Sequence, residues 1–169
     1  MIDWSKKLNH RWLFGILTIT QAGIIFYLSQ RDWSATKTKI TGNFSNLLHL
    51  PLFGALAAFF ALALGAASSA RASRSYWWAI LGTGLYGLSD EIHQNYRPQR
   101  HPSVVDLIVD VHGAALACFL LSLLLDQDRR FRDRVLSAVL ILLGAVGWCF
   151  FGSQFFPDAD QTLRYLLAG

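Results

Sequence analysis

Charged side chains are scarce in this chain of 169 residues, of which 15% are Asp, Glu, Lys or Arg and 53% are hydrophobic. Soluble domains usually carry about 25% charged residues. The apolar residues are gathered into runs that approach the roughly 20 residues a bilayer-spanning helix needs. The scarcity of charge therefore indicates a membrane protein rather than a soluble one. The length is typical of one domain, so we expect a single domain over residues 1–169.

Cysteines and common ligand motifs are also rare. The two cysteines, Cys118 and Cys149, fall inside apolar runs with neither CxxC nor Cys/His spacing, so they are expected to be buried side chains rather than zinc or redox ligands. No HExxH-like pattern is present, and the sequence identifies no cofactor. The net charge of +4 comes without any nucleic-acid motif, so we expect no nucleic-acid partner.

Five apolar runs indicate the architecture. They cover residues 12–28, 47–67, 76–92, 104–125 and 135–151. The predicted fold is all-α, a polytopic transmembrane helix bundle with five spans, or four if one run does not cross. Pro51 is expected in the first turn of the second helix, where its missing N–H costs little. The small residues between 54 and 61 would let another helix approach closely. Residues 152–169 fit either a short interfacial helix or a frayed end.

The distribution of basic residues favours a cytoplasmic N-terminus. With five spans, successive links lie on alternate sides of the membrane. The side of the N-terminus carries Lys6, Lys7, Arg11, Arg71, Arg74, Arg129, Arg130, Arg132 and Arg134. The opposite side carries Arg31, Lys37, Lys39, Arg97, Arg100 and Arg164. Because cytoplasmic loops are enriched in Lys and Arg, we expect a protein of the cytoplasmic membrane whose C-terminus is external.

Residues 86–113 hold the densest group of ionisable side chains, including Glu91, the only glutamate in the chain. By span parity, the start of the second helix, the end of the third and the start of the fourth lie on one side. Polar residues at these three ends should therefore converge at one membrane surface, which the charge distribution makes the external one. They are His49, Asp90, Glu91, His93, Gln94, Arg100, Asp106 and Asp110.

Helical spacing assigns several of these side chains to common faces. One stripe, at i, i+3, i+4 and i+7, comprises Asp90, His93, Gln94 and Arg97. A second, on the fourth helix, comprises Asp106, Asp110, Gly113 and Ala117. The small residues of the second stripe are expected to bring the third and fourth helices together. Glu91 and His112 point away from both stripes, which leaves either free to face another helix.

Asp110 is the most costly of the carboxylates, because it lies inside an apolar run. A central Asp in a spanning helix costs roughly 2.5–3.5 kcal/mol, so Asp110 needs a cation, hydrogen-bond donors or a proton. Arg100 and His49 are the expected partners.

The combined pattern resembles the VanZ-like family of small bacterial integral membrane proteins. The resemblance covers roughly residues 27–117 and rests on residues 26–30 (FYLSQ), His49, Tyr86-Gly87, Asp90-Glu91, Gln94, Pro98, Arg100, Asp106, Asp110 and Gly113. Asn46 and Phe53 depart from it where lysine and tyrosine are frequent, Ala117 replaces a frequent glycine, and asparagine is also common at Asp110. The resemblance implies a bacterial inner-membrane protein. The family is named for resistance to the glycopeptide teicoplanin, and the resemblance brings no settled reaction.

Three interpretations of the cluster remain open. In the first, the protein is an enzyme acting on the headgroup of a cell-envelope lipid or precursor, with Glu91 or Asp90 as base and His49 as its partner. A divalent metal held by carboxylates and His49 is a variant. In the second, the protein binds such a lipid, or a glycopeptide, without turnover. In the third, the cluster is a structural ion-pair network or a partner-binding surface. The candidate catalytic residues are His49, Asp90, Glu91, Gln94, Asp106 and Asp110, and the candidate substrate-binding residues are Arg100 and Tyr86.

Overall fold

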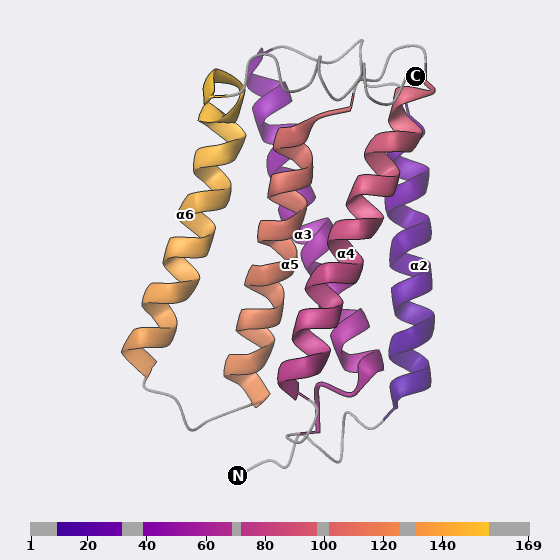
Figure 1. Ribbon diagram of the computed structural model, residues 1–169, viewed down its shortest axis with the longest axis vertical. Helices are drawn as coiled ribbons and strands as arrows, with labels where there is room; N and C mark the ends of the chain where they lie inside the picture. The colour runs from indigo at the N-terminus through magenta and orange to yellow at the C-terminus, as the bar shows by residue number, and fades with distance from the viewer. Residues whose placement is uncertain (1–9, 32–38, 69–71, 98–101, 126–130, 156–169) are drawn as a thin grey trace.

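The computed structural model describes residues 10–31, 39–68, 72–97, 102–125 and 131–155, and at 39–45, 131–135 and 153–155 it describes the backbone alone. This part of the chain forms five α-helices and contains no β-strand. They are α2 (Arg11–Ser29), α3 (Lys39–Leu64), α4 (Ala72–Asn95), α5 (Val104–Leu125) and α6 (Phe131–Phe155). The helices stand side by side, with α6 and α2 at the two edges of the view (Figure 1). The predicted all-α fold class is confirmed.

Three of the helices are long and apolar enough to cross a bilayer, namely α2, the Asn46–Leu64 part of α3, and α5. The apolar stretch of α6, Leu136–Gly152, is shorter. The last turns of α4 carry several ionisable side chains, which lower its hydropathy. Large apolar side chains face outward, as contact with lipid tails requires; Trp77, for example, is 72% exposed. The span count of five stays a prediction.

The start of α3 corrects one expectation. The helix begins at Lys39 rather than near residue 47, so Pro51 lies inside it and not in its first turn. Because proline has no N–H, the carbonyl of Leu47 cannot receive its usual helical hydrogen bond from residue 51. One residue further along, the Leu52 carbonyl accepts a 3.0 Å hydrogen bond from the Gln21 amide, which ties α2 to this part of α3.

The end of α3 is set by glycine. The helix stops at Leu64, and Gly65 adopts a φ of 99°, a conformation that residues with a Cβ disfavour. The Ala66 N–H then reaches back to the Ala61 carbonyl at 2.9 Å, and this bond closes the helix end in a Schellman-type arrangement. The predicted run extended to residue 67, so the glycine signal shortens it. By contrast, α5 has the bounds that its apolar run predicted.

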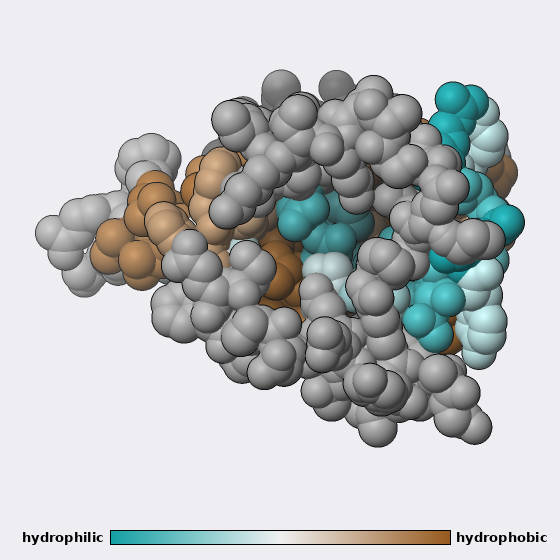
Figure 2. Space-filling view, turned by 90° about the horizontal axis from the view of Figure 1, so that it is seen from above, coloured by the Kyte–Doolittle hydropathy of each residue, from teal (hydrophilic) through white to brown (hydrophobic). Residues whose placement is uncertain are grey.

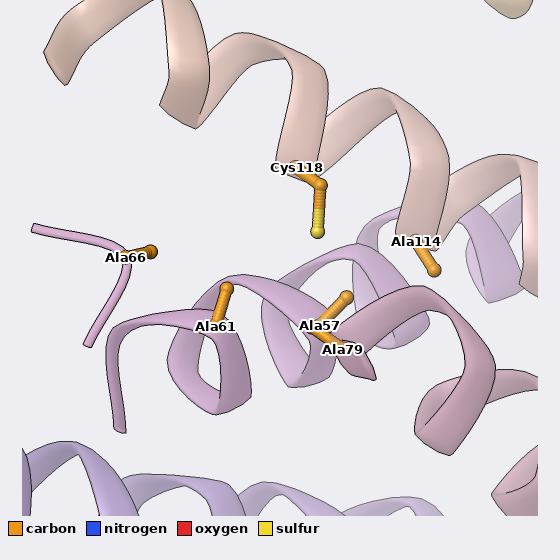
Figure 3. Packing of buried hydrophobic residues seen from close by; sticks show 6 residues of the cluster. All are labelled: Ala57, Ala61, Ala66, Ala79, Ala114 and Cys118. Carbon is orange, nitrogen blue, oxygen red and sulfur yellow. The ribbon is translucent and has the colours of Figure 1, made fainter. Parts of the chain in front are cut away.

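The core is built from small side chains where α3, α4 and α5 meet. Its members are all buried: Ala57, Ala61, Ala66, Ala79, Ala114 and Cys118. Ala114 and Cys118 project from α5 toward the alanines of the neighbouring helices (Figure 3). Cys149 is buried too, beside Val105 and Val109, so both cysteines are buried as expected. Small side chains allow the helix backbones to come close, which is the usual basis of helix association in membranes.

Gly113 and Ala117, the small members of the second stripe, make their close contacts with α3, whereas the prediction assigned them to α4. A Cβ built on Gly113 would lie 2.5 Å from the Leu50 carbonyl oxygen and 3.0 Å from the Leu50 Cα. A Cβ on Gly54 would lie 3.1 Å from the Gly113 carbonyl oxygen and 3.4 Å from the Ala117 Cβ. Spacing along one helix defines a stripe but does not determine which neighbour the stripe meets.

We predict that Gly113→Ala destabilises the bundle, because the new methyl group would overlap backbone atoms that cannot rotate away. Overpacking of this kind costs about 1–3 kcal/mol. Reversible unfolding in mixed detergent micelles would measure the loss. The control is Gly23→Ala in α2, where a Cβ meets nothing within 4 Å; it should leave stability unchanged or raise it. Equal stability of Gly113→Ala and the wild type would contradict the close α3–α5 contact.

Candidate functional site

Most of the candidate residues lie at one end of the bundle, where α4 ends, α5 begins and the early part of α3 packs beside α5. This is the upper end in Figure 1, where the connection from α4 to α5 lies. Seen from above, hydrophilic surface is visible in the middle of this end (Figure 2). We call the group the polar cluster; it consists of His49, Asp90, Glu91, Gln94, Asp106 and Asp110. Arg100 lies outside the described residues.

His49 and Asp110 form the central contact of the polar cluster. His49 Nδ1 lies 2.9 Å from Asp110 Oδ1 and joins α3 to α5. The side chain of Asp110 is 1% exposed, whereas that of His49 is 22% exposed. The imidazole stacks on Phe53, with ring centroids 5.7 Å apart and an interplanar angle of 5°. The sequence predicted His49 and Arg100 as partners of Asp110, and the structure shows the contact with His49.

Gly87 makes room for the Asp110 carboxylate on the other side. A Cβ at this position would lie 2.7 Å from Asp110 Oδ2, so only a glycine lets the carboxylate lie flat against α4. Asp110 Oδ2 has no hydrogen-bond partner among the described residues. The Asp110 carboxylate thus lies between His49 of α3 and the α4 backbone at Gly87.

Glu91 makes a different contact from the one expected. Its side chain is 1% exposed, and Oε2 accepts a 2.6 Å hydrogen bond from the backbone N–H of Ser103, just before α5. Ser103 Oγ in turn accepts the Asp106 N–H at 3.3 Å. Glu91 therefore faces the start of α5, and the histidine pairs with Asp110 rather than with Glu91 or Asp90. Sequence reasoning missed Ser103, although its position three residues before Asp106 is a helix-capping signal.

The predicted face of α4 divides between the interior and α2. Asp90 and Gln94 are both buried, and the Gln94 amide donates to Asp90 Oδ2 at 2.9 Å. His93 turns toward α2, where the Gln30 amide donates to its Nε2 at 2.7 Å and its ring lies 5.1 Å from that of Phe26. The remaining member, Arg97, is exposed. This face of α4 therefore carries the buried Asp90–Gln94 pair, the His93 contact with α2 and the exposed side chain of Arg97.

Tyr86 and His112, at the margin of the cluster, contact other helices. The Tyr86 hydroxyl donates to the Ala22 carbonyl of α2 at 2.6 Å. His112 Nδ1 bonds the Ile108 carbonyl of its own helix at 2.8 Å, and its Nε2 lies 3.3 Å from where a Cβ on Gly144 of α6 would be. His112 thus faces α6, away from the cluster.

The described side chains do not form a metal site. Among them, no three His, Cys, Asp or Glu residues are grouped so that they could hold an ion. Besides Asp110 Oδ2, the buried atoms Asp90 Oδ1 and Glu91 Oε1 have no hydrogen-bond partner within the described ranges. Leaving a buried acceptor unsatisfied costs about 1–3 kcal/mol. Such a cost is typical of groups kept for function, which makes these oxygens candidates for contact with a ligand or a proton.

A helical bundle with long apolar helices, outward-facing hydrophobic side chains and carboxylates buried at one end is an integral membrane protein. A family model described as VanZ/LLP1 matches residues 10–125, so the chain belongs to this VanZ-like family. The match covers α2 to α5 and ends before α6. Comparison with the curated proteins and with the solved structures found no match.

We predict that His49 and Asp110 are energetically coupled. In a double-mutant cycle with His49→Gln and Asp110→Asn, the interaction energy should reach about 0.5–3 kcal/mol, the range for residues in contact. Detergent unfolding of the four proteins would measure it. The matched control replaces His93 by Gln, because His93 bonds Gln30 instead; that substitution should be additive with Asp110→Asn. Additivity in the His49 cycle would contradict the pairing.

Proposed function

We propose that this VanZ-like protein acts on the headgroup of a cell-envelope lipid or lipid precursor, with His49 as the acid–base group that Asp110 orients. The observation that carries the proposal is the 2.9 Å contact between a buried carboxylate and an imidazole that keeps part of its surface exposed. An imidazole whose one nitrogen is fixed by a carboxylate is the common arrangement for proton transfer in enzymes.

The tautomer of His49 follows from this contact. An ionised Asp110 accepts the Nδ1–H, which leaves the lone pair of the neutral ring on Nε2. Nε2 can then take a proton from a hydroxyl group or water and return it to a leaving group. Asp110 fixes the ring and stabilises the imidazolium that forms, while Phe53 stacks against one face of the ring. This assignment makes His49, rather than Glu91 or Asp90, the proton-transfer group.

A lipid headgroup suits the position of the cluster. The cluster lies at one end of the apolar helices, and the end of a helix that crosses a bilayer is where headgroups meet the hydrocarbon core. Arg100 belongs to the connection that begins after Arg97 and ends just before Ser103, whose N–H contacts Glu91. An arginine can bind a phosphate or carboxylate through two parallel hydrogen bonds, so Arg100 is our candidate for holding the anionic part of the headgroup. Arg100 would also offset the repulsion between such an anion and the carboxylates.

The family name and the charge distribution together suggest where this activity operates. A cytoplasmic N-terminus places the polar cluster at the external face of the membrane. We therefore propose that the activity alters an external lipid or precursor and lowers susceptibility to teicoplanin-type compounds, and that binding of the same headgroup without turnover is its nearest variant.

A non-enzymatic, structural role is the second candidate, and two contacts favour it. The Glu91 bond to Ser103 joins the last turns of α4 to the start of α5, and the Asp90–Gln94 pair ties successive turns at the end of α4. A network that only holds helix ends together needs no ligand. In that case Arg100→Ala should lower yield and melting temperature together. A stable but inactive Arg100→Ala protein would favour a functional role instead.

We predict that His49→Gln and Asp110→Ala, which removes the acceptor of the His49 Nδ1–H, abolish the phenotype while the proteins still insert at normal levels. Loss of a general acid–base group typically costs about 10²–10⁴ in rate. The measurements are teicoplanin susceptibility of a deletion strain carrying each variant, and mass spectrometry of its extracted envelope lipids. His112→Gln is the control, because this histidine faces α6. Wild-type susceptibility and lipid composition in the His49→Gln strain would refute the proposal.

We also predict that the α4–α5 end of the bundle is accessible from outside the cell. In a variant whose two native cysteines are replaced by serine, Tyr96→Cys should react with a membrane-impermeant maleimide in intact cells. Tyr96 is exposed beside the polar cluster, and Ser68, exposed after α3, lies toward the opposite end. Ser68→Cys should therefore react only after the cells are opened. The reverse labelling pattern would place the cluster at the cytoplasmic face.

A further inference from the structure

The N-terminus of α5 is capped in an unusual way, because two helices share the capping groups. In a capping box, the N-cap Ser or Thr accepts the N–H of the residue three positions on, and the acidic side chain of that residue accepts the N-cap N–H. Ser103 and Asp106 have this spacing, and the first bond is present at 3.3 Å. The reciprocal bond to the Ser103 N–H is made at 2.6 Å by Glu91, which belongs to α4.

We infer that Glu91 is a positioning residue, which completes the cap of α5 from the neighbouring helix and thereby sets Asp110 against His49. This inference rests on the proposed role of the His49–Asp110 pair. It gives Glu91 a task distinct from proton transfer, although it is the only glutamate in the chain and lies in the polar cluster.

The position of Asp110 explains why the cap matters. Asp110 follows Ser103 by seven residues, which is about two helical turns, so both lie on the same side of α5. Gly87 and Glu91 are likewise one turn apart on α4. The Glu91–Ser103 bond and the Gly87–Asp110 approach are therefore successive contacts along one helix interface. A shift of the Glu91–Ser103 bond would therefore move the Asp110 carboxylate relative to Gly87.

Electrostatics also suits Glu91 to this place. A helix N-terminus carries a partial positive charge, and its first N–H groups have no acceptor within the helix. A carboxyl oxygen that accepts one of these N–H groups is stabilised there by the field and by the hydrogen bond itself. Since Glu91 supplies that bond, Asp106 is not required for it and makes other contacts. The Oε2 atom of Glu91, engaged with a backbone N–H, is then not the atom that exchanges protons with a substrate.

Three substitutions at residue 91 separate positioning from proton transfer. Glu91→Gln keeps an oxygen that can accept the Ser103 N–H but cannot act as an acid or base. Glu91→Asp keeps the acid but is too short to reach Ser103. Glu91→Ala removes both. Each is prepared as the full chain in lipid nanodiscs, with ¹⁵N-labelled histidine, and the His49 imidazole signals are assigned by their absence in His49→Gln. The same variants are tested for teicoplanin susceptibility in cells.

We expect Glu91→Gln to retain the His49 imidazole shifts and the phenotype, and Glu91→Asp and Glu91→Ala to change the shifts and lose the phenotype. Ser89→Ala is the control, because this exposed serine of α4 bonds the Tyr86 carbonyl of its own helix and should leave the His49 signal in place. Should Glu91→Ala fail to fold, the comparison of Gln with Asp decides the matter.

Two results would overturn the inference. In one, Glu91→Gln loses the phenotype while the His49 shifts are unchanged, which assigns proton transfer to Glu91 itself. In the other, Glu91→Asp leaves the His49 shifts unchanged, which shows that the cap does not position the pair. Failure of the proposed function gives a different pattern, in which His49→Gln does not alter susceptibility although Glu91→Asp still shifts the His49 signal. The positioning role would then stand without the proposed activity.

Discussion

The close approach of α3 and α5 is the constraint on which the rest of the polar cluster depends. The glycine that permits it, Gly113, lies three residues after Asp110 on the same face of α5. The backbone that it meets belongs to Leu50, the residue next to His49. The contact that brings the two helices together is therefore adjacent, on both helices, to the pair that we propose for chemistry. Packing and chemistry cannot be altered independently here, because one tight crossing determines both.

The polar cluster also shows how a membrane protein can keep carboxylates buried. Asp110 pairs with His49, Glu91 accepts the N–H of Ser103 at the helix cap, and Asp90 accepts a hydrogen bond from the Gln94 amide. One oxygen of each carboxylate is satisfied, by α3 for Asp110, by the turn before α5 for Glu91 and by its own helix for Asp90, and the other oxygen has no partner among the described residues. A purely structural network would be expected to satisfy both oxygens, since unsatisfied buried acceptors are costly. The half-satisfied arrangement is what favours a functional site over a clamp.

Part of this arrangement could be predicted from the sequence. The apolar runs predict the helices, and span parity alone predicts that His49, Asp90 and Asp106 lie at one end. The pairing of those groups could not be predicted, because helical periodicity describes each helix about its own axis and not its rotation relative to its neighbours. For this reason the small stripe at Gly113 was assigned to α4 instead of α3, and Pro51 was placed in a first turn that lies earlier. The capping role of Ser103 was readable from its spacing to Asp106, but its acceptor on α4 was not.

α6 packs against the start of α5 but carries no member of the polar cluster. The family match ends at residue 125, and every member of the polar cluster lies on α3, α4 or α5. α6 packs on the other side of α5, where Gly144 faces His112 and Gly152 approaches Val105, whose side chain would lie 2.9 Å from an added Cβ. Val105 immediately precedes Asp106, so α6 contacts the first turn of α5. The start of α5 is thus held between the α4 cap on one side and α6 on the other. Within the matched segment, the cap contact acts on the His49–Asp110 pair through α5, whereas Cys149 of α6 packs with Val105 and Val109 of α5 and with Leu47 and Leu50 of α3. α6 therefore supports both helices that carry the pair.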